Sequence, residues 1–438
     1  MHPSEAIRGR HSQLLSGRRV LVGISGSIAA IEVPRIVREL IRHGARVRAV
    51  MSPEATRIVT VEAVTFATGA APITRLTGDV EHVTLLGPGE GRADLLLLAP
   101  ATANTISKIA HGIDDTPVTS CASVALGGGV PILIAPAMHA HMGLNPAVQE
   151  NLEKLRSWGV GVIDPIAAEG EEKIASPEQV AAAVLHRLAR GPWKDRRVIV
   201  IGGASREKID DVRSVTNESS GETAVALANQ AHFRGAVVAL WAGGMRVPVP
   251  EYLPVERWSS VADLERLARR RASDLRAADA VVVPAALSDF TLRAHEGKLD
   301  SRASASLRID LVRAPKILPL LRRFAARPTL LVGFKLEARR SSSELEASAR
   351  RLLEENDLDE VVANDRASMG SSETEALVVS RAGDRHWVRG KKSEVAGKLL
   401  DDLARALAHR PASRPARRRS GRPKSPRSRT PSRRPRST

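Results

Sequence analysis

The sequence contains a single cysteine, Cys121, among its 438 residues. One thiol cannot form an intrachain disulfide and cannot build a metal site that needs several cysteines. Cys121 lies in the apolar stretch TPVTSCASVAL, which favours a buried small side chain over a nucleophile. The chemistry of this chain is therefore expected to come from other residue types.

Long apolar runs are also missing. No run of about 18 apolar residues occurs, so we expect no segment to span a membrane. The first residues, MHPSEAIRGRHSQLLSGRR, lack the apolar centre of a secretory signal, so the expected location is the cytoplasm. A chain of 438 residues, 43% of them hydrophobic, is long enough for two domains with separate cores.

Acidic residues are absent from residues 410–438, which contain twelve lysines and arginines. Subtracting these twelve charges from the formal net charge of +17 leaves only +5 for the rest of the chain. A segment rich in Pro, Ser and Arg cannot bury enough apolar surface to fold, so residues 410–438 are predicted to be a disordered tail. It has no aromatic residue for stacking on bases, so we expect only non-specific contacts with nucleic acid.

Apolar strands alternate with helical stretches along the rest of the chain. Five short apolar runs, each ended by Gly, Pro or Ser, predict strands at residues 18–25, 45–52, 93–102, 131–138 and 160–165. Residues 27–44 predict a helix with Ile28, Ile31, Val37, Leu40 and Ile41 on one side, and Pro34 as a kink or an early turn. This alternation is typical of a parallel sheet covered on both faces.

The same pattern restarts after residues 189–197, ARGPWKDRR, which we interpret as a linker. Further strands are predicted at residues 197–205, 235–244, 279–289, 329–337 and 359–365. The sequence therefore predicts an α/β fold with two Rossmann-like parallel-sheet domains, residues 1–190 and 191–409, followed by the tail. Such sheets bind ligands at the carboxyl ends of their strands.

The first strand-end loop is Gly23-Ile24-Ser25-Gly26-Ser27. Glycines let the backbone approach an anion, while helix amides and serine hydroxyls supply donors. The loop is not G-x-G-x-x-G, and no acidic residue closes the next strand to hold a ribose. A monophosphate such as that of FMN therefore fits better than a dinucleotide, although a Gly/Ser loop alone also occurs as a simple tight turn.

Three separated stretches sharpen this interpretation: GISGSIAA, APATANTISKIAHGIDDTPVTS and APAMHAHM. Together they resemble flavin-containing cysteine decarboxylases, above all the decarboxylase half of the family of bifunctional phosphopantothenoylcysteine decarboxylase/phosphopantothenate–cysteine ligases. The resemblance covers most of residues 18–180. It implies an FMN site lined by Ser25, Gly26, Ser27, Ser52, Thr102, Ala103 and Asn104.

The resemblance also places the catalytic histidine at His82, in DVEHVTL. A base with a pKa near neutrality suits a proton transfer during flavin oxidation of the substrate thiol. Many relatives have Asn where this chain has His139, and they carry a cysteine in a clamp that matches residues 167–176 here. The pattern is similar to the archaeal-type branch, in which His139 would hold the substrate carboxylate and Glu169 or Lys173 would serve in the clamp. The alternative, a metal pair of His139 and His141, lacks a nearby third ligand motif.

A second strand-end loop begins the string GGASREKIDDVRSVTNESSG at residues 202–221. It lacks the Lys-Ser/Thr of a P-loop and instead resembles the ligase half of the same family. The resemblance implies that CTP activates the carboxylate of 4′-phosphopantothenate as an acyl-CMP, from which cysteine displaces CMP. Asn217 would hold this intermediate and Lys298 would face the phosphoryl centre. The other implied substrate-binding residues are Gly203, Ser205, Ala285, Ala286, Asp289, Pro315, Lys316, Ile317 and Phe334.

Mg²⁺ is the expected partner of the triphosphate. The family often carries lysines where this chain has Arg350 and Arg351, which leaves the nucleotide preference open. The resemblance further implies a homo-oligomer with trimeric flavin halves and dimeric ligase halves, in an assembly as large as a dodecamer.

The sequence thus predicts a bifunctional enzyme of coenzyme A biosynthesis, a decarboxylase and a ligase in one chain. Two alternatives stay open at this point. A different cysteine decarboxylase, or a protein similar to flavin prenyltransferases, fused to a nucleotide-binding module would explain the first loop but not residues 201–221. A polyanion-binding protein would explain only the tail.

Overall fold

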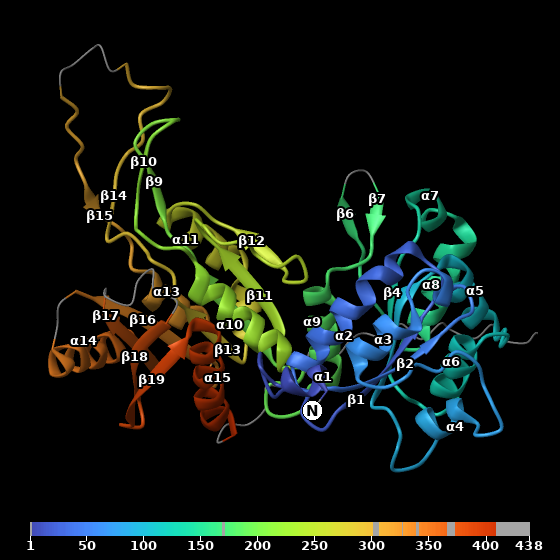
Figure 1. The fold of residues 1–438 in the computed structure, drawn as a ribbon. Helices are drawn as coiled ribbons and strands as arrows, with labels where there is room; N and C mark the ends of the chain where they lie inside the picture. Colours follow the sequence, from blue (N-terminus) through green and yellow to red (C-terminus); the bar gives the residue numbers. More distant parts are fainter. Residues whose placement is uncertain are drawn as a thin grey trace, which may run out of the picture.

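The computed structural model describes residues 2–168, 171–300, 306–325, 327–338, 341–365 and 373–408. Two lobes, each built around a mainly parallel sheet, follow one another along the chain (Figure 1). Both sheets carry helices on each face, as the alternation of apolar strands and helices predicts. The expected α/β fold with two Rossmann-like domains is therefore confirmed. The predicted tail at residues 410–438 lies outside the described residues.

The first sheet has the strand order β2-β1-β3-β4-β5, and all its pairings are parallel. Its strands are β1 (Arg19–Ile24), β2 (Arg46–Met51), β3 (Leu95–Ala101), β4 (Ile132–Pro136) and β5 (Gly161–Val162). Every residue of β3 and β4 is buried, which explains why these strands are continuous apolar runs instead of alternating ones.

Helices of the first lobe form two layers. One core cluster joins the sheet to α2 (Val33–Arg42), α3 (Val61–Thr68) and α9 (Pro177–Leu188). The cluster on the other face contains residues of α4 (Glu81–Leu86), α5 (Ala103–His111), α6 (Pro117–Gly127) and α8 (Pro146–Ser157). The short elements are α1 (Pro3–Ala6), η1 (Ile28–Glu32), η2 (Ala55–Arg57), α7 (Ala140–Gly143) and the hairpin β6 (Ile166–Ala168) and β7 (Glu171–Lys173).

The helix predicted for residues 27–44 is divided in two. A 3-10 turn, η1, precedes α2, and Pro34 stands in the first turn of α2, as the sequence predicts for an early turn. Val37, Leu40 and Ile41 are buried, but the expectation for Ile28 and Ile31 is wrong, because their exposed fractions are 75% and 56%. The tighter 3-10 turn rotates these side chains away from the buried stripe of α2.

The second sheet has the order β12-β11-β8-β13-β16-β17-β18-β19. Its parallel strands are β8 (Arg197–Gly202), β11 (Val237–Ala242), β12 (Val255–Arg257), β13 (Ala280–Val283), β16 (Leu330–Glu337) and β17 (Glu360–Asp365). The antiparallel strands β18 (Glu373–Ser380) and β19 (Arg385–Lys391) extend it. The sequence did not predict these two: β18 has an apolar run of only four residues, and the apolar residues of β19 are flanked by charges.

Helices also cover both faces of the second sheet. One core cluster contains residues of α10 (Glu222–Phe233) and α15 (Lys392–Ala408). The opposite cluster contains residues of α11 (Val261–Arg270), α12 (Ala272–Ala277), α13 (Ile317–Phe324) and α14 (Ser342–Glu355). Two small hairpins stand away from the body of this lobe in Figure 1: β9 (Arg206–Lys208) with β10 (Ser214–Thr216), and β14 (Phe290–Thr291) with β15 (Val312–Arg313).

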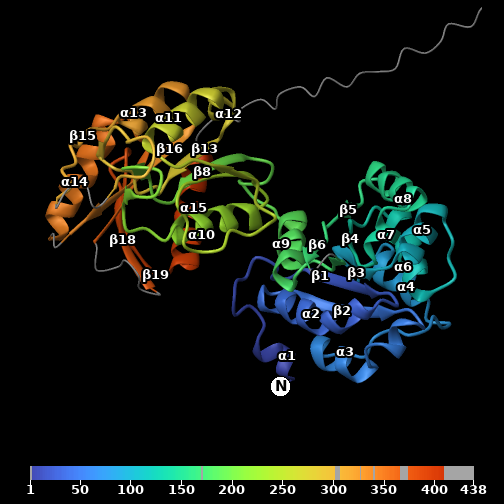
Figure 2. The same cartoon turned by 90° about the horizontal axis from the view of Figure 1, so that it is seen from above.

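The segment interpreted as a linker is anchored in the second lobe. Trp193 is 2% exposed, and its Nε1 donates a hydrogen bond to the Leu400 carbonyl oxygen at 2.9 Å. The lobes meet where α9 packs against α10 (Figure 2). There the rings of His186 and His232 stack with centroids 4.4 Å apart, and the His186 ring lies 3.0 Å from the His232 carbonyl oxygen.

In the part of the chain that the structure describes, no helix is both long and apolar enough to cross a bilayer. This agrees with the lack of long apolar runs in the sequence.

Candidate functional site

The first candidate site lies at the carboxyl edge of the first sheet. In the order β2-β1-β3-β4-β5, the winding direction reverses between β1 and β3. Loops diverge at such a reversal and leave a crevice for a ligand, and the same strand order in flavodoxins binds FMN at this point. The loops that follow β1, β2, β3 and β4 therefore define the region in which to place the predicted residues.

Ser25 joins two of these loops. Its Oγ donates to the Pro100 carbonyl oxygen at 2.8 Å and accepts from the Thr102 backbone N–H at 3.0 Å. Ser25 is only 2% exposed, so its hydroxyl holds the β1 and β3 loops together. This is a positioning role, which the sequence analysis did not separate from direct contact with a phosphate.

Gly26 explains why the loop needs glycine. A Cβ at this position would lie 2.4 Å from the Glu54 Cβ, which is closer than non-bonded carbon atoms can approach. The β1 loop is therefore pressed against the loop after β2, where Ser52 donates its backbone N–H to the Ile24 carbonyl oxygen at 2.9 Å. Ser25, Gly26, Ser27, Ser52 and Thr102 consequently share one sheet edge.

The remaining predicted flavin residues begin helix α5. Thr102 is its N-cap and accepts a hydrogen bond from the Thr105 backbone N–H at 3.2 Å. Ala103 is buried, whereas Asn104 is exposed in the first turn. The positive end of the helix dipole and free backbone amides thus face the crevice, which is a favourable place for a phosphate.

His82 belongs to α4 and is half-buried. Its Nδ1 is buried, with no hydrogen-bond partner among the described residues. An unpaired buried polar atom destabilises a protein by about 1–3 kcal/mol, so this nitrogen suits a bond to a ligand or to another molecule. No described contact joins His82 to the strand-end loops, and its place beside a flavin stays a prediction.

His139 follows β4 and caps helix α7. Its Nδ1 accepts from the His141 backbone N–H at 3.3 Å, and the two rings have centroids 5.0 Å apart. Among the described residues, no third His, Cys or carboxylate completes a metal-ligating group with this pair. Of the predicted clamp, Glu169 lies outside the described residues, and only the backbone of Lys173 is described, in β7.

Cys121 is fully buried in α6. Burial raises the pKa of its thiol to about 12, and the nearby Asp114 and Glu81 carboxylates add to the rise. A thiol that stays protonated at neutral pH is a poor nucleophile, so the prediction of an inert small side chain is confirmed.

The second candidate site lies where the second sheet reverses, between β8 and β13. Gly203 has a φ of +90°, and a Cβ there would lie 2.9 Å from the Gly243 carbonyl carbon. The loop after β8 therefore touches the loop after β11. Ser205 is completely buried, and its Oγ accepts from the Ser288 N–H at 2.9 Å. Gly203 and Ser205 shape the loops, but they do not line the two cavities that open here.

Asn217 is held in a defined orientation at this edge. Its Nδ2 donates to the Ala286 carbonyl oxygen at 3.1 Å, and the backbone N–H of Ala286 donates to the Gly203 oxygen at 2.9 Å. One bond fixes the amide group and leaves its Oδ1 and second N–H for a ligand.

A cavity of about 770 Å³ collects most of the residues implied for the nucleotide. Those present in its lining are Asn217, Ala285, Ala286, Asp289, Pro315, Lys316, Ile317 and Phe334. Lys316 Nζ pairs with Asp289 Oδ1 at 2.7 Å, and both side chains are largely exposed, at 74% and 73%. A cation in a cleft of this size suits a phosphorylated ligand.

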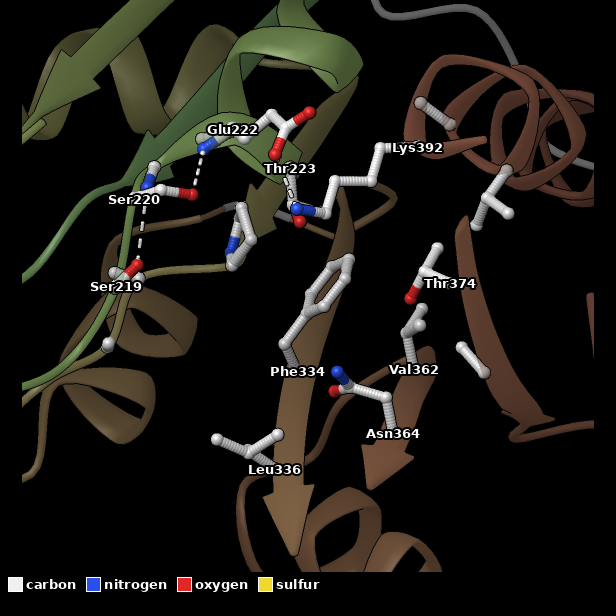
Figure 3. Close-up of a pocket in the computed structure, with 18 of the residues that line it drawn as sticks. Ser219, Ser220, Glu222, Thr223, Phe334, Leu336, Val362, Asn364, Thr374 and Lys392 are labelled. Atoms are coloured by element: carbon white, nitrogen blue, oxygen red, sulfur yellow. Dashed lines mark hydrogen bonds and ion pairs between the residues drawn. The ribbon is translucent and has the colours of Figure 1, made fainter. Parts of the chain in front are cut away.

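A second cavity of about 530 Å³, which was not predicted from the sequence, is also lined by Phe334 (Figure 3). Its wall includes the first turn of α10, Arg246, Asn364, Thr374 and Lys392. Lys392 forms an ion pair with Glu222, and its side chain is only 12% exposed. Phe334 and Leu336 line both cavities, which are therefore two parts of one cleft. No local signal could reveal Lys392, which lies 170 residues from its partner.

Lys298 lies outside this cleft. It is exposed, and the chain beside it is fixed to the β9–β10 turn, where Asp210 Oδ2 accepts from the Leu299 N–H at 3.1 Å. Burial tends to raise the pKa of Asp210, but bonds from the Arg213, Val212 and Leu299 N–H groups outweigh it and lower the pKa. Lys298 lines neither of the two cavities described for a single chain, and its contact with a phosphoryl group stays a prediction.

Comparisons with known proteins match both lobes. The flavoprotein family matches residues 8–189, and the family described as DNA/pantothenate metabolism flavoprotein C-terminal domain matches residues 193–407. The coenzyme A biosynthesis bifunctional protein CoaBC of Thermococcus kodakarensis is 42% identical over 93% of this chain and 100% of its own length. The proteins of the same name from Methanocaldococcus jannaschii and Bacillus subtilis are 34% identical over 93% of this chain and 31% identical over 82% of it. These matches cover 98% and 88% of those two relatives.

Proposed function

Because this chain belongs to the family of coenzyme A biosynthesis bifunctional proteins, we propose that its two sheet edges carry out two consecutive reactions of one route. The chain is a bifunctional enzyme, with a flavoprotein decarboxylase domain followed by a phosphopantothenate–cysteine ligase domain. The observation that carries this conclusion is the match to the Thermococcus kodakarensis relative through both domains, over that protein's whole length. The relatives at 42% and 34% identity come from archaea, as the archaeal-type motif pattern predicts.

The ligase reaction is assigned to the cleft between β8 and β13. The 4′-phosphopantothenate carboxylate attacks the α-phosphorus of CTP, and pyrophosphate leaves with the electron pair of the broken P–O bond. The cysteine amine then attacks the acyl carbon, and CMP leaves. Asn217, fixed on Ala286, is positioned to hold the acyl group, and Lys316 to neutralise phosphate charge.

Mg²⁺ is proposed as the partner of the triphosphate. Mg²⁺ binds mainly through substrate phosphates and one or two carboxylates. Asp289 is an exposed carboxylate of the cleft suited to supply one, and Glu218 and Glu355 also line this cavity. Lys316 would then exchange its ion pair with Asp289 for a bond to the nucleotide.

The decarboxylase reaction is assigned to the β1/β3 reversal of the first sheet, with FMN as the cofactor. When bound, FMN would supply a reversible two-electron acceptor for the thiol side of 4′-phosphopantothenoylcysteine, so the decarboxylation would need no external oxidant. The tight Gly26 loop and the α5 amino end would hold the phosphate of FMN. His82 would accept and return a proton through its unpaired Nδ1, and His139 would bind the substrate carboxylate.

We further propose that the enzyme works as a homo-oligomer. Ile28 and Ile31, 75% and 56% exposed, lie directly after the β1 loop. Val212 is 67% exposed in the β9–β10 turn, where the Asp211 N–H donates to the carbonyl oxygen of Gly297, the residue before Lys298, at 3.4 Å. Apolar side chains exposed beside two candidate sites favour contacts with other copies of the chain, in trimers through the flavin half and dimers through the ligase half. Lys298 would then reach the phosphoryl centre across the dimer contact.

One purification tests both assignments. The protein should be yellow, with the absorbance of a bound flavin, and should release CO₂ when given 4′-phosphopantothenate, cysteine, CTP and Mg²⁺. Omitting CTP should stop CO₂ release from these precursors but not from added 4′-phosphopantothenoylcysteine. A colourless protein that takes up no FMN would contradict the decarboxylase assignment. The ligase assignment would then be tested separately, by the CTP-dependent formation of 4′-phosphopantothenoylcysteine.

Lys298→Gln tests the assigned phosphoryl contact. Acyl-CMP formation should fall, while decarboxylation of added 4′-phosphopantothenoylcysteine should not change. Mixing this variant with the separately inactive Asn217→Ala variant should restore ligase activity in part, if Lys298 acts across a dimer contact. If Lys298→Gln ligates at the wild-type rate, Lys298 is not part of the ligase site.

A further inference from the structure

A cluster of two histidines and a glutamate lies away from both candidate active sites. His11 comes from the chain before β1, and Glu39 and His43 come from the carboxyl end of α2. The His11 Nδ1 lies 2.9 Å from Glu39 Oε1, and the His43 Nε2 lies 3.4 Å from the same oxygen. One ligand atom from each residue lies within 4.8 Å of the other two. Two imidazole nitrogens therefore converge on one carboxylate oxygen.

The cluster is buried on one side and open on the other. Glu39 and His43 are 7% and 8% exposed, whereas the His11 side chain is 51% exposed. An ion could therefore enter past His11 and reach two ligands that are already in place. The fourth position of a tetrahedral site would open toward solvent on the same side and take a water molecule.

Neighbouring polar groups fix the orientation of these side chains. The Ser12 Oγ lies 2.8 Å from the His43 Nδ1, so this hydroxyl holds the ring from its far side. The Arg42 Nη1 donates to Glu39 Oε2 at 3.0 Å and leaves Oε1 to the two imidazoles. Metal-binding histidines and carboxylates are generally oriented by such outer hydrogen bonds.

We propose that His11, Glu39 and His43 form a binding site for a zinc-class divalent cation. Tetrahedral Zn²⁺ binds nitrogen and oxygen at about 2.0–2.2 Å, which separates neighbouring ligand atoms by about 3.3–3.5 Å. The two nitrogen–oxygen separations of 2.9 Å and 3.4 Å differ from this spacing by a few tenths of an ångström, and the two imidazole nitrogens lie within 4.8 Å of each other. Where an imidazole nitrogen carries the proton of its hydrogen bond to Oε1, that proton is released to water when the ion binds. The nitrogen then bonds to the ion instead. Two nitrogen ligands select Zn²⁺ or Co²⁺ over Mg²⁺.

The competing explanation is that the cluster binds no ion and is held together only by its hydrogen bonds and by the ion pair between Arg42 and Glu39. They would hold the amino-terminal segment on α2 without an ion, and they predict no selectivity among divalent cations. The two explanations therefore differ in a measurable way, in the affinity and coordination spectrum of added Zn²⁺ and Co²⁺.

The position of the cluster indicates a structural role for the ion. His43 contacts the Phe233 ring at the end of α10, with centroids 5.9 Å apart. The site therefore joins the amino-terminal segment to α2 at the junction with the second lobe. None of its residues belongs to the strand-end loops of the flavin half or to the ligase cleft.

The test uses full-length, untagged protein, stripped of metal by a chelator and then dialysed. Titration with Zn²⁺ against a chromophoric indicator should show one site per chain, and Co²⁺ should give the intense visible absorption of a tetrahedral complex. Zn²⁺ should raise Tm, and Mg²⁺ at the same concentration should not.

Variants assign the site to these residues. His11→Gln should weaken Zn²⁺ binding by about 100-fold or more and abolish the Co²⁺ absorption, since loss of an outer partner alone weakens binding by about 10–100-fold. Because His11 is half-exposed, this variant should fold. Ser12→Ala should weaken binding by about 10-fold. His111→Ala, which removes an exposed histidine whose Nδ1 lies 2.9 Å from the Ser107 carbonyl oxygen, is the matched control and should bind as the wild type does. Equal Zn²⁺ affinity in wild type and His11→Gln, or a wild type without the Co²⁺ absorption, would overturn the proposal.

Discussion

The two lobes use the same sheet edge in different ways. In the ligase half, the reversal between β8 and β13 opens into cavities of about 770 and 530 Å³ that one chain encloses. In the flavin half, the β1 loop is pressed onto Glu54, and exposed Ile28 and Ile31 follow it directly. The same kind of sheet edge thus forms a cleft within a single chain in one lobe, and in the other a tight glycine loop with two exposed isoleucines beside it. The rule locates a ligand, but the surrounding helices decide whether one copy of the chain can enclose it.

The sharpest way to separate the two halves is His82→Asn. If His82 moves the proton, decarboxylation of 4′-phosphopantothenoylcysteine should fall by about 10²–10⁴-fold, while ligation keeps its wild-type rate. His111→Asn is the matched control for an exposed histidine in the same lobe. CO₂ release from synthetic substrate is the measurement, and full decarboxylation by His82→Asn would refute the assignment.

The reciprocal change is Asn217→Ala. Removing the amide that is fixed on Ala286 should lower acyl-CMP formation by about 10²–10³-fold, as is typical of a lost donor at a developing charge. Decarboxylation of added substrate should be unaffected, which makes it the internal control. Ligation within a few-fold of wild type would show that Asn217 only shapes the loop.

Replacing both Ile28 and Ile31 by Asp should disrupt the proposed subunit contact of the flavin half. A charge buried in an apolar contact has no partner, so the mass in solution should fall toward that of smaller assemblies. Mass photometry measures the change, and Val237→Asp, at a similarly exposed position with 57% exposure, should leave the mass unchanged. An unchanged mass for the double variant would place the subunit contact elsewhere.

An effect of pH on the free energy of unfolding is expected in the ligase half. Burial raises the pKa of Glu360 to about 8, with Asp402 adding to the rise and Arg405 opposing it, and its Oε1 has no hydrogen-bond partner among the described residues. Between the ordinary value of 4.5 and about 8, the folded chain keeps a proton that the unfolded chain loses. The free energy of unfolding should therefore decrease as pH rises through this window.

Glu360→Gln should remove that dependence and raise the free energy of unfolding at pH 8 by about 1–3 kcal/mol. Glu354→Gln, at an exposed position of α14, is the control and should keep the wild-type pH profile. Denaturant unfolding at several pH values measures both, and identical profiles for Glu360→Gln and wild type would contradict the prediction.

The smallest effect is expected from deleting residues 409–438. If both reactions occur at the sheet edges, the shortened enzyme should have unchanged kcat and KM for both reactions. Weaker retention on heparin should be the only change, because twelve positive charges in residues 410–438 are removed. A loss of either activity would give the tail a part in catalysis or assembly.

Most of the fold could be predicted because buried parallel strands are apolar runs that end in small residues. The loops at Gly26 and Gly203 could be predicted for a different reason. Glycine marks places where the loops pack so closely that a Cβ would clash. The exposure of Ile28 and Ile31 was not predictable, because a helical pattern does not reveal a 3-10 turn. The Lys392–Glu222 pair and the convergence of His11 on Glu39 depend on the folded path of the chain, which local sequence does not encode.

The burial of Trp193 has a practical consequence for separating the two activities. Its indole fills space beneath α15 and donates to the Leu400 oxygen, although it precedes the first strand of the ligase sheet. A ligase fragment that starts at Arg196 would lack this ring, and a cavity left by a missing tryptophan destabilises a protein by about 3–5 kcal/mol. A ligase fragment that starts before Gly191 should fold stably on its own. A fragment that starts at Arg196 should be less stable and should aggregate more readily.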